Sequence, residues 1–277
     1  MTLRILCLHG YTQNALSFEK KTAVFRKSLK GIADLGMMKL DIQEGFRVYV
    51  TAPHIVPIPT LNTPEEREED ELENLEPEAV PYGWWTSSPE KPAYKGFDES
   101  LKGICQVLEK QGPFDGVLGF SQGASMASML QLLLERPHLS PIMSGCKHDP
   151  FKFAIIVSGF EPRDQEKLTW YTNKYPVLHT KKNESSDETN NPQTVGDHNK
   201  DGEDKENQEP QLVYGVQGAS MHVIGRNDVI IEPERSEGLL KYHQFKKPVT
   251  LYHEGGHYLP SNAASRQAYK SFVQSHM

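Results

Sequence analysis

The sequence predicts an α/β fold with a mostly parallel central sheet and helices on both of its faces. Short apolar runs of strand length recur along the chain, and longer segments with helical spacing of apolar residues separate most of them. The predicted strands span residues 3–8, 46–50, 114–118, 153–158, 220–224 and 249–252. Several of these runs are apolar throughout, as expected for strands buried on both faces of a parallel sheet. Strands and helices that alternate in this way favour parallel pairing through crossover connections.

The segments between these strands carry helix signals. Asn14 or Ser17 can cap the first helix, in which Phe18, Phe25 and Leu29 share one face at helical spacing. Further helices are predicted over residues 97–110, 124–134, 233–242 and 262–273.

The chain of 277 residues is long enough for one large domain with a well-buried core. We expect a single domain over residues 1–277 that carries an acidic loop segment over about residues 57–95. A polar insert over about residues 181–210 contains no aliphatic or aromatic residue except Val195, so it cannot offset its ordering entropy and is predicted to be disordered. These two segments explain the low hydrophobic fraction of 37% and the mean hydropathy of -0.58.

Charge and cysteine content exclude several classes of protein. A formal net charge of -7 argues against a nucleic-acid-binding or anionic-membrane surface. No stretch is apolar for long enough to form a membrane span or a signal-peptide core. The three cysteines, Cys7, Cys105 and Cys146, are too few and too widely spaced to indicate a disulfide framework or a metal site. We expect free thiols, no metal and no cofactor, in a cytoplasmic protein, with an additional nuclear pool as the alternative.

The pattern Gly-Phe-Ser-Gln-Gly, which ends at Gly123, lies between a predicted strand and a predicted helix. A Gly-x-Ser-x-Gly pattern in this position is the nucleophile elbow of the α/β-hydrolases. The turn forces Ser121 into a strained backbone conformation, so only very small neighbours fit at Gly119 and Gly123. We expect the Ser121 hydroxyl to stand clear of the sheet, above the positive end of the following helix.

A serine hydroxyl needs a base, because it is almost fully protonated at neutral pH. His257 follows the last predicted strand, and Asp228 follows the strand before it, where a carboxylate can orient the imidazole. The order Ser, Asp, His along the chain is that of the α/β-hydrolases. We prefer His257 to His253, which falls where the strand is still ending. Glu254 and Asp115 are the alternatives for the acid.

An oxyanion hole requires two backbone N–H groups that point at the developing negative charge. We expect one from Gln122, the residue after the nucleophile, and one from Tyr11, in the loop after the first predicted strand. His9 in the same loop is expected to have a structural role and to hold the loop in place.

An aromatic cluster over residues 82–85 follows the acidic loop segment. Its two tryptophans, Trp84 and Trp85, have two equally supported interpretations. They either fill the core or form a substrate-binding wall of the active site.

Four stretches of the chain together resemble the FSH family of serine hydrolases, which is itself similar to the ovarian-tumour-associated hydrolases of animals. They are residues 8–11, 113–124, 222–228 and 255–260, and residues 82–85 and 96–100 also fit the family pattern. The resemblance covers nearly the whole chain except the two acidic segments. It implies an α/β-hydrolase domain without a large cap, activity on acyl esters or thioesters, and a triad of Ser121, Asp228 and His257. The chain differs from the family in its long insert and at Val229, where the family often has proline.

We therefore expect a serine hydrolase that cleaves small-molecule acyl esters through an acyl-enzyme intermediate. One alternative is an acyl thioesterase that releases acyl groups from a carrier. Another is an inactive hydrolase fold that serves as a binding module, with the acidic insert recruiting a protein partner.

Overall fold

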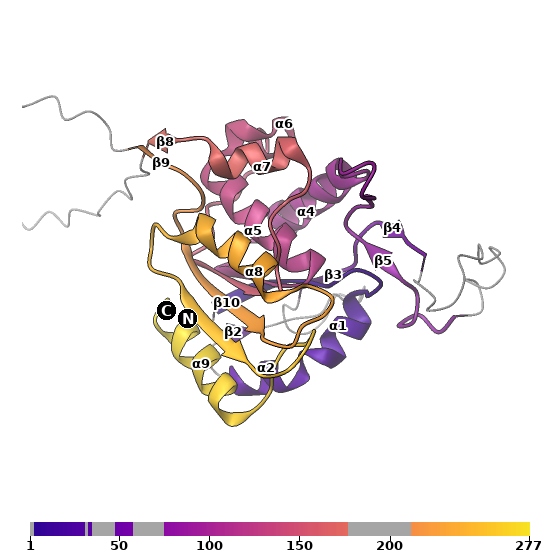
Figure 1. Cartoon of the computed structure of the whole chain (residues 1–277), viewed down its shortest axis with the longest axis vertical. Helices are drawn as coiled ribbons and strands as arrows, with labels where there is room; N and C mark the ends of the chain where they lie inside the picture. Colours follow the sequence, from indigo (N-terminus) through magenta and orange to yellow (C-terminus); the bar gives the residue numbers. More distant parts are fainter. Residues whose placement is uncertain (1–2, 31–32, 35–47, 58–74, 177–211) are drawn as a thin grey trace, which may run out of the picture.

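A seven-stranded sheet forms the centre of the protein in the computed structural model, which describes residues 3–30, 33–34, 48–57, 75–176 and 212–277 (Figure 1). Its strands are β1 (Leu3–Leu8), β2 (Ala33–Asp34), β3 (Tyr49–Val50), β6 (Gly116–Phe120), β7 (Phe153–Val157), β10 (Ala219–Gly225) and β11 (Val249–His253). The strand order is β11-β10-β7-β6-β1-β2, and β3 also pairs with β1. Each of these pairings is parallel, which confirms the predicted sheet.

Helices cover both faces of this sheet (Figure 1). One face packs against α1 (Ala15–Lys21), α2 (Ala23–Ser28) and α9 (Ala263–Gln274). The other packs against α4 (Phe97–Gln111), α5 (Gln122–Glu135), α6 (Pro141–Ser144), α7 (Gln165–Thr172) and α8 (Pro233–Leu240). The described residues also form two short 3-10 helices, η1 (Pro137–Leu139) and η2 (Lys241–His243).

The two cores follow from the alternation of side chains along each strand. In β1, Leu6 and Leu8 pack into the core beneath α4 and α5, whereas Ile5 and Cys7 pack against α1, α2 and α9. Every residue of α5 is buried, because this helix lies between the sheet and the outer helices of its face. Because the sheet is parallel, the carboxyl ends of β6, β10 and β11 lie along the same edge of it, with β7 between β6 and β10.

Several local predictions needed correction. The first helix is divided at Thr22, whose backbone (φ -93°, ψ 6°) leaves the helical region and whose hydroxyl bonds to Tyr49 Oη. The strand expected over residues 114–118 lies two residues further on, and the one expected over 46–50 is described only as β3. Two helices, one short strand and two strand pairs had no recognisable pattern: α6, α7, β2, the pair β4 (His54–Ile55) with β5 (Tyr82–Gly83), and the pair β8 (Tyr175–Pro176) with β9 (Leu212–Val213). Residues 58–74 of the predicted acidic loop lie outside the described residues, as does the insert over 181–210.

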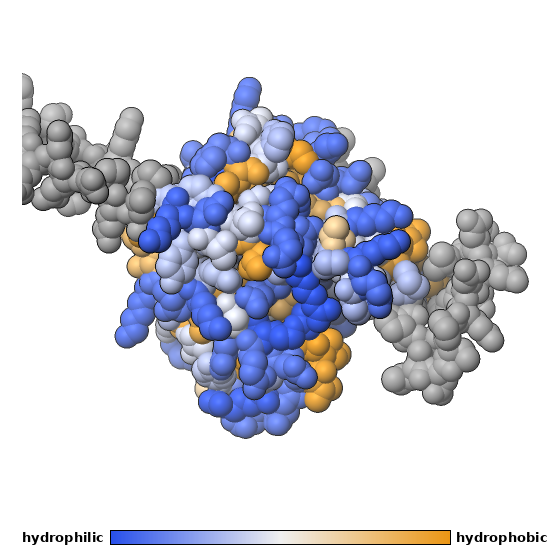
Figure 2. Space-filling model, turned by 45° about the horizontal axis from the view of Figure 1, so that its top comes forward, coloured by the Kyte–Doolittle hydropathy of each residue, from blue (hydrophilic) through white to orange (hydrophobic). Residues whose placement is uncertain are grey.

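The surface seen in Figure 2 is mainly hydrophilic, and its hydrophobic residues lie in separate patches. No described helix combines the length and the hydrophobicity that crossing a bilayer requires.

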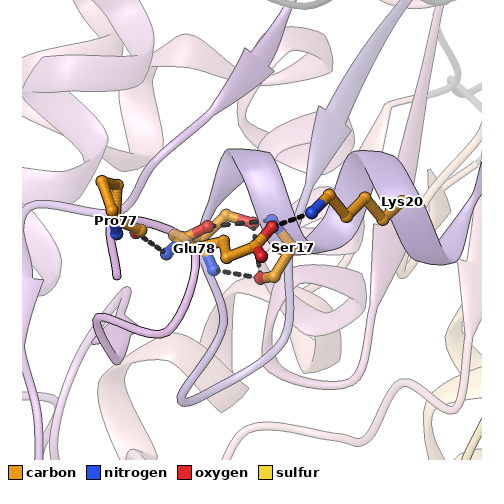
Figure 3. A network of polar contacts seen from close by, with 5 residues as sticks. Ser17, Lys20, Pro77 and Glu78 are labelled. Carbon is orange, nitrogen blue, oxygen red and sulfur yellow. Dashed lines mark hydrogen bonds and ion pairs between the residues drawn. The ribbon is translucent and has the colours of Figure 1, made fainter. Parts of the chain in front are cut away.

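A polar network fixes the start of α1 (Figure 3). Asn14 Oδ1 accepts the Ser17 N–H at 2.9 Å, and Ser17 Oγ accepts the Asn14 N–H at 3.0 Å, which forms a capping box. Asn14 Nδ2 also donates to Pro77 O at 2.9 Å, and Lys20 forms an ion pair with Glu78. These contacts hold the segment that precedes β5 against the amino end of α1, next to the loop that follows β1.

Two fully buried histidines face each other between β10 and η2. The ring centroids of His222 and His243 lie 4.7 Å apart. Burial lowers the pKa of His222 to about 3. Burial, together with the neighbouring His222, also lowers the pKa of His243 well below its usual value. Both imidazoles are therefore neutral in the folded protein at neutral pH.

We predict that the free energy of unfolding decreases as the pH falls below about 6.5. The unfolded chain takes up protons on both histidines there, whereas the folded chain excludes them until the pH nears the lowered pKa values. Each proton that only the unfolded chain binds lowers the free energy of unfolding by about 1.4 kcal/mol per pH unit. Urea unfolding between about pH 7 and about pH 5 measures this slope.

His222→Gln should reduce this slope by about the contribution of one proton. The same change at exposed His138 is the control and should leave the slope as it is. An equal slope in His222→Gln and in the unaltered protein would contradict this account.

Candidate active site

Ser121 occupies a strained turn between β6 and α5. Its backbone has φ 53° and ψ -118°, a positive φ that a residue with a side chain rarely adopts. A Cβ at Gly119 would lie 2.2 Å from Gly123 O, and one at Gly123 would lie 2.3 Å from the carbonyl oxygens of Leu8 and His9. Both positions therefore require glycine. The backbone has the strained strand-turn-helix geometry that the motif predicts.

Asp228 and His257 are joined by a short hydrogen bond, with 2.7 Å between His257 Nδ1 and Asp228 Oδ2. The other carboxylate oxygen of Asp228 accepts the N–H groups of Ile230 at 3.0 Å and Ile231 at 2.9 Å. Burial alone would raise the pKa of Asp228, but the hydrogen bonds from Ile231 and His257 outweigh it and lower that pKa. An ionised Asp228 accepts a hydrogen bond from the N–H at His257 Nδ1. The proton of the neutral ring is then on Nδ1, and Nε2 has a free lone pair.

Ser121 and His257 line one cavity of about 600 Å³. The other lining residues are Tyr11, Thr12, Gln13, Phe18, Lys21, Phe120, Ile230, Tyr258 and Leu259. Six of these nine side chains are aromatic or aliphatic, and Lys21 is the basic one, whose pKa burial lowers. Ser121, Asp228 and His257 follow β6, β10 and β11, so the parallel sheet brings all three to its carboxyl end.

The alternative acids and the alternative base lie elsewhere. His253 is still part of β11 and does not line the cavity. Glu254 forms a surface ion pair with Arg226, at 3.2 Å between Oε1 and Nε. Asp115 precedes β6, at the opposite end of the strand from Ser121, and pairs with Lys152 at 2.8 Å.

The loop after β1 is held by His9, as expected from the sequence. His9 Nε2 accepts the Ala52 N–H at 2.9 Å, and His9 Nδ1 donates to Gly10 O at 2.7 Å. Burial lowers the pKa of His9 to about 4, so the ring is neutral and acts as a structural group. The Trp84 indole N–H donates to His9 O at 2.8 Å and connects this loop to the aromatic cluster.

Two backbone N–H groups beside Ser121 are available to a ligand. In the described part of the chain, neither the Tyr11 N–H nor the Gln122 N–H has a hydrogen-bond acceptor. The Tyr11 loop runs close to the elbow, since a Cβ at Gly10 would lie 3.3 Å from Ser121 Cβ. The Gln122 N–H is the first of α5, so it lies at the positive end of that helix.

Trp84 and Trp85 lie in the core, and neither lines the cavity. Their side chains are 1% and 2% exposed, and Trp85 stacks on Tyr94 at 4.4 Å between ring centroids. The assignment of these tryptophans to a substrate-binding wall is therefore corrected in favour of the core interpretation. Large aromatic rings gain more from burial in a closed cluster than at an open cavity, and the Trp84 indole N–H has its acceptor, His9 O, inside the core.

The role of the Gln122 side chain was not predicted. Its Oε1 accepts the backbone N–H of Trp84, and its Nε2 donates to the backbone carbonyl of Trp85, both at 2.8 Å. Gln122 thereby fixes the start of α5 to the aromatic cluster. The cavity-lining role of Phe18 was also missed, because its helical spacing indicated only a core position.

Comparison with known proteins shows the family to which the chain belongs. The family model described as "Serine hydrolase (FSH1)" matches residues 1–269. Esterase OVCA2 of Mus musculus is 32% identical over 98% of this chain and 96% of its own length, and the Homo sapiens protein is 31% identical over 98% and 95%.

The crystal structure of Arabidopsis thaliana SOBER1 covers 100% of this chain and 99% of its own, with a TM-score of 0.54 and 12% identity. At that identity it shows the shared α/β-hydrolase fold alone, which confirms the predicted fold. The family match extends over almost the whole chain. The protein is an enzyme that belongs to the FSH1 family of serine hydrolases.

Proposed function

We propose that this protein hydrolyses acyl esters through an acyl-enzyme intermediate, with Ser121 as nucleophile, His257 as base and Asp228 as the residue that orients His257. The observation that carries this proposal is the 2.7 Å hydrogen bond between Asp228 and His257 at a cavity that His257 shares with Ser121. Membership of a serine hydrolase family supports the same class of reaction.

In the first half of the reaction, Ser121 Oγ attacks the carbonyl carbon of the ester and His257 Nε2 takes the proton from Oγ. Asp228 is suited to this step because its ionised carboxylate stabilises the imidazolium that forms. His257 then gives the proton to the leaving alcohol, the ester C–O bond breaks, and the acyl group remains on Ser121. In the second half, His257 deprotonates a water molecule that attacks the acyl-enzyme and releases the acid.

The Tyr11 and Gln122 N–H groups would stabilise the negative charge on the carbonyl oxygen. Both lie beside Ser121 and have no acceptor within the described residues. The positive end of α5 adds to their effect. Each such donor is typically worth about a hundredfold to a thousandfold in rate.

The cavity favours substrates with an apolar acyl part. Phe18, Phe120 and Leu259 line it and provide an apolar wall close to Ser121. A small-molecule acyl ester would place its carbonyl at Ser121 and its hydrocarbon against this wall.

Lys21 favours a second candidate function, the release of acyl groups from a thioester carrier. Such carriers bear phosphate groups, and Lys21 is the cationic side chain of the cavity lining. The acyl-enzyme chemistry would be the same for both candidates.

The three cysteines are unpaired, which supports a reducing compartment such as the cytoplasm, with access to the nucleus as the alternative. The insert, expected to recruit any protein partner, lies outside the described residues, so a partner remains a prediction.

We predict that Ser121→Ala lowers kcat for an acyl ester by up to about a millionfold while the protein stays folded. The same variant should lose all labelling by a fluorophosphonate probe, which reacts with an activated serine. Ser271→Ala, on an exposed part of α9, is the control and should keep both activity and labelling. If the folded, unaltered protein failed to label, the inactive binding module would replace the hydrolase.

Asp228→Asn should lower kcat by roughly ten-thousandfold. A neutral amide does not select the His257 tautomer with a free Nε2 and does not stabilise the imidazolium. Glu254→Gln removes a nearby exposed carboxylate and should leave kcat close to that of the unaltered enzyme. Ester hydrolysis followed at saturating substrate measures both variants, and a larger loss in Glu254→Gln would reassign the acid.

Matched substrates with one acyl chain distinguish the ester and thioester candidates. The ester proposal predicts that kcat/KM for a neutral oxygen ester equals or exceeds that for an acyl phosphopantetheine thioester. A preference for the thioester that decreases in Lys21→Met would favour the carrier-dependent reaction instead.

A further inference from the structure

Two cysteines and a glutamate lie together at α4, the helix that precedes β6. Cys105 and Glu109 are four residues apart on α4 and so share one face of the helix. Cys146 belongs to the segment that follows α6. The two sulfur atoms and a Glu109 carboxylate oxygen all lie within 4.8 Å of one another. Among the described residues, this is the one group of three such ligands.

From the sequence we expected no metal site, because the cysteines are few and widely spaced, with a separation of 41 residues between Cys105 and Cys146. The packing of α6 and its following segment against α4 removes that separation. The distance along the chain was therefore a poor guide to the distance in space.

Hydrogen bonds hold Glu109 and the segment that carries Cys146 in place. Glu109 Oε1 accepts the Lys147 N–H at 3.1 Å, which places the carboxylate beside Cys146. His148 Nε2 accepts the Phe114 N–H at 2.9 Å and holds the same segment against the approach to β6. A ligand would thus meet three groups whose backbones are fixed relative to one another.

The two cysteines are in direct contact, because Cys146 Sγ lies 4.0 Å from Cys105 O. Two adjacent thiols and a carboxylate form a set of ligands that suits a divalent cation, since coordination converts thiols to thiolates.

An open cavity of about 640 Å³ borders the cluster and is lined in part by Glu109 and Cys146. It gives an ion a path from solvent and leaves room for a water molecule beside the three ligands. Gly112 and Pro113 also line it, so it lies at the amino end of β6, whereas Ser121 follows the carboxyl end of that strand.

We propose that Cys105, Glu109 and Cys146 bind a soft divalent cation of the zinc type, with a water molecule as the fourth ligand. Zinc binds thiolates at about 2.3 Å in a tetrahedron, which puts neighbouring ligand atoms about 3.8 Å apart. The three atoms reach this arrangement through side-chain shifts of about 1 Å. Two sulfur ligands select zinc over magnesium or calcium, which prefer oxygen. The ion would connect α4 to the segment after α6 and stabilise the fold without contacting the ester substrate.

Cobalt(II) binding to the full-length protein tests this proposal, with a phosphine reductant present to keep the thiols reduced. We expect one equivalent to bind, with the sulfur-to-cobalt charge-transfer band and the visible bands of tetrahedral cobalt. Zinc should displace it and raise Tm by roughly 5 °C or more at a hundredfold excess over Kd. Cys105→Ser and Cys146→Ser should each abolish the charge-transfer band or halve it, and Glu109→Gln should weaken binding about tenfold.

Glu99→Gln, at an exposed glutamate on the first turn of α4, is the matched control and should bind like the unaltered protein. Ester hydrolysis shows whether each variant is folded, because none of these residues lines the Ser121 cavity. Lack of stoichiometric cobalt binding would overturn the proposal, as would binding that survives both cysteine variants unchanged. A Cys105–Cys146 disulfide in a protein that binds no cobalt after reduction would overturn it in favour of thiol oxidation.

Discussion

The close approach of Gly123 to the end of β1 is the constraint on which the active site depends. A side chain at this position would collide with the carbonyl oxygens of Leu8 and His9, so α5 can start directly against β1 only with glycine there. That contact places the first N–H of α5 beside the loop that carries Tyr11. The nucleophile turn and the two candidate oxyanion donors are therefore products of one packing contact.

His257 differs from the buried histidines of the core in its electrostatic surroundings. Burial lowers the pKa of His9 and of His222 and keeps those rings neutral, because no carboxylate of the described residues lies against them. His257 instead donates to Asp228, whose charge is maintained by the Ile231 N–H and by His257 itself. The same residue type thus serves as a structural group in one place and as a candidate base in another.

Sequence patterns were most informative where backbone chemistry limits the choice of residue. The glycines around Ser121, and the positions of Asp228 and His257 after successive strands, indicated the sheet and the candidate triad together. The tryptophans were ambiguous, because large aromatic rings suit a core and a cavity wall equally well until packing is known. The Gln122 side chain was unpredictable, since its partners are backbone groups almost 40 residues away. Strands of two residues have no period to detect.

The two ends of β6 illustrate why a parallel sheet can separate reactivity from stabilisation. Its carboxyl end leads into a strained turn, and strain is tolerated there only because the surrounding packing fixes the backbone. Its amino end is approached through a segment that several contacts hold, among them the hydrogen bond between His148 and Phe114 and the ion pair between Asp115 and Lys152. A cation held by Cys105, Glu109 and Cys146 would add a further connection in this second region. Because α4 packs on the same core as α5, a firmer α4 would also resist displacement of α5. The first residue of α5, Gln122, carries one of the two candidate oxyanion donors.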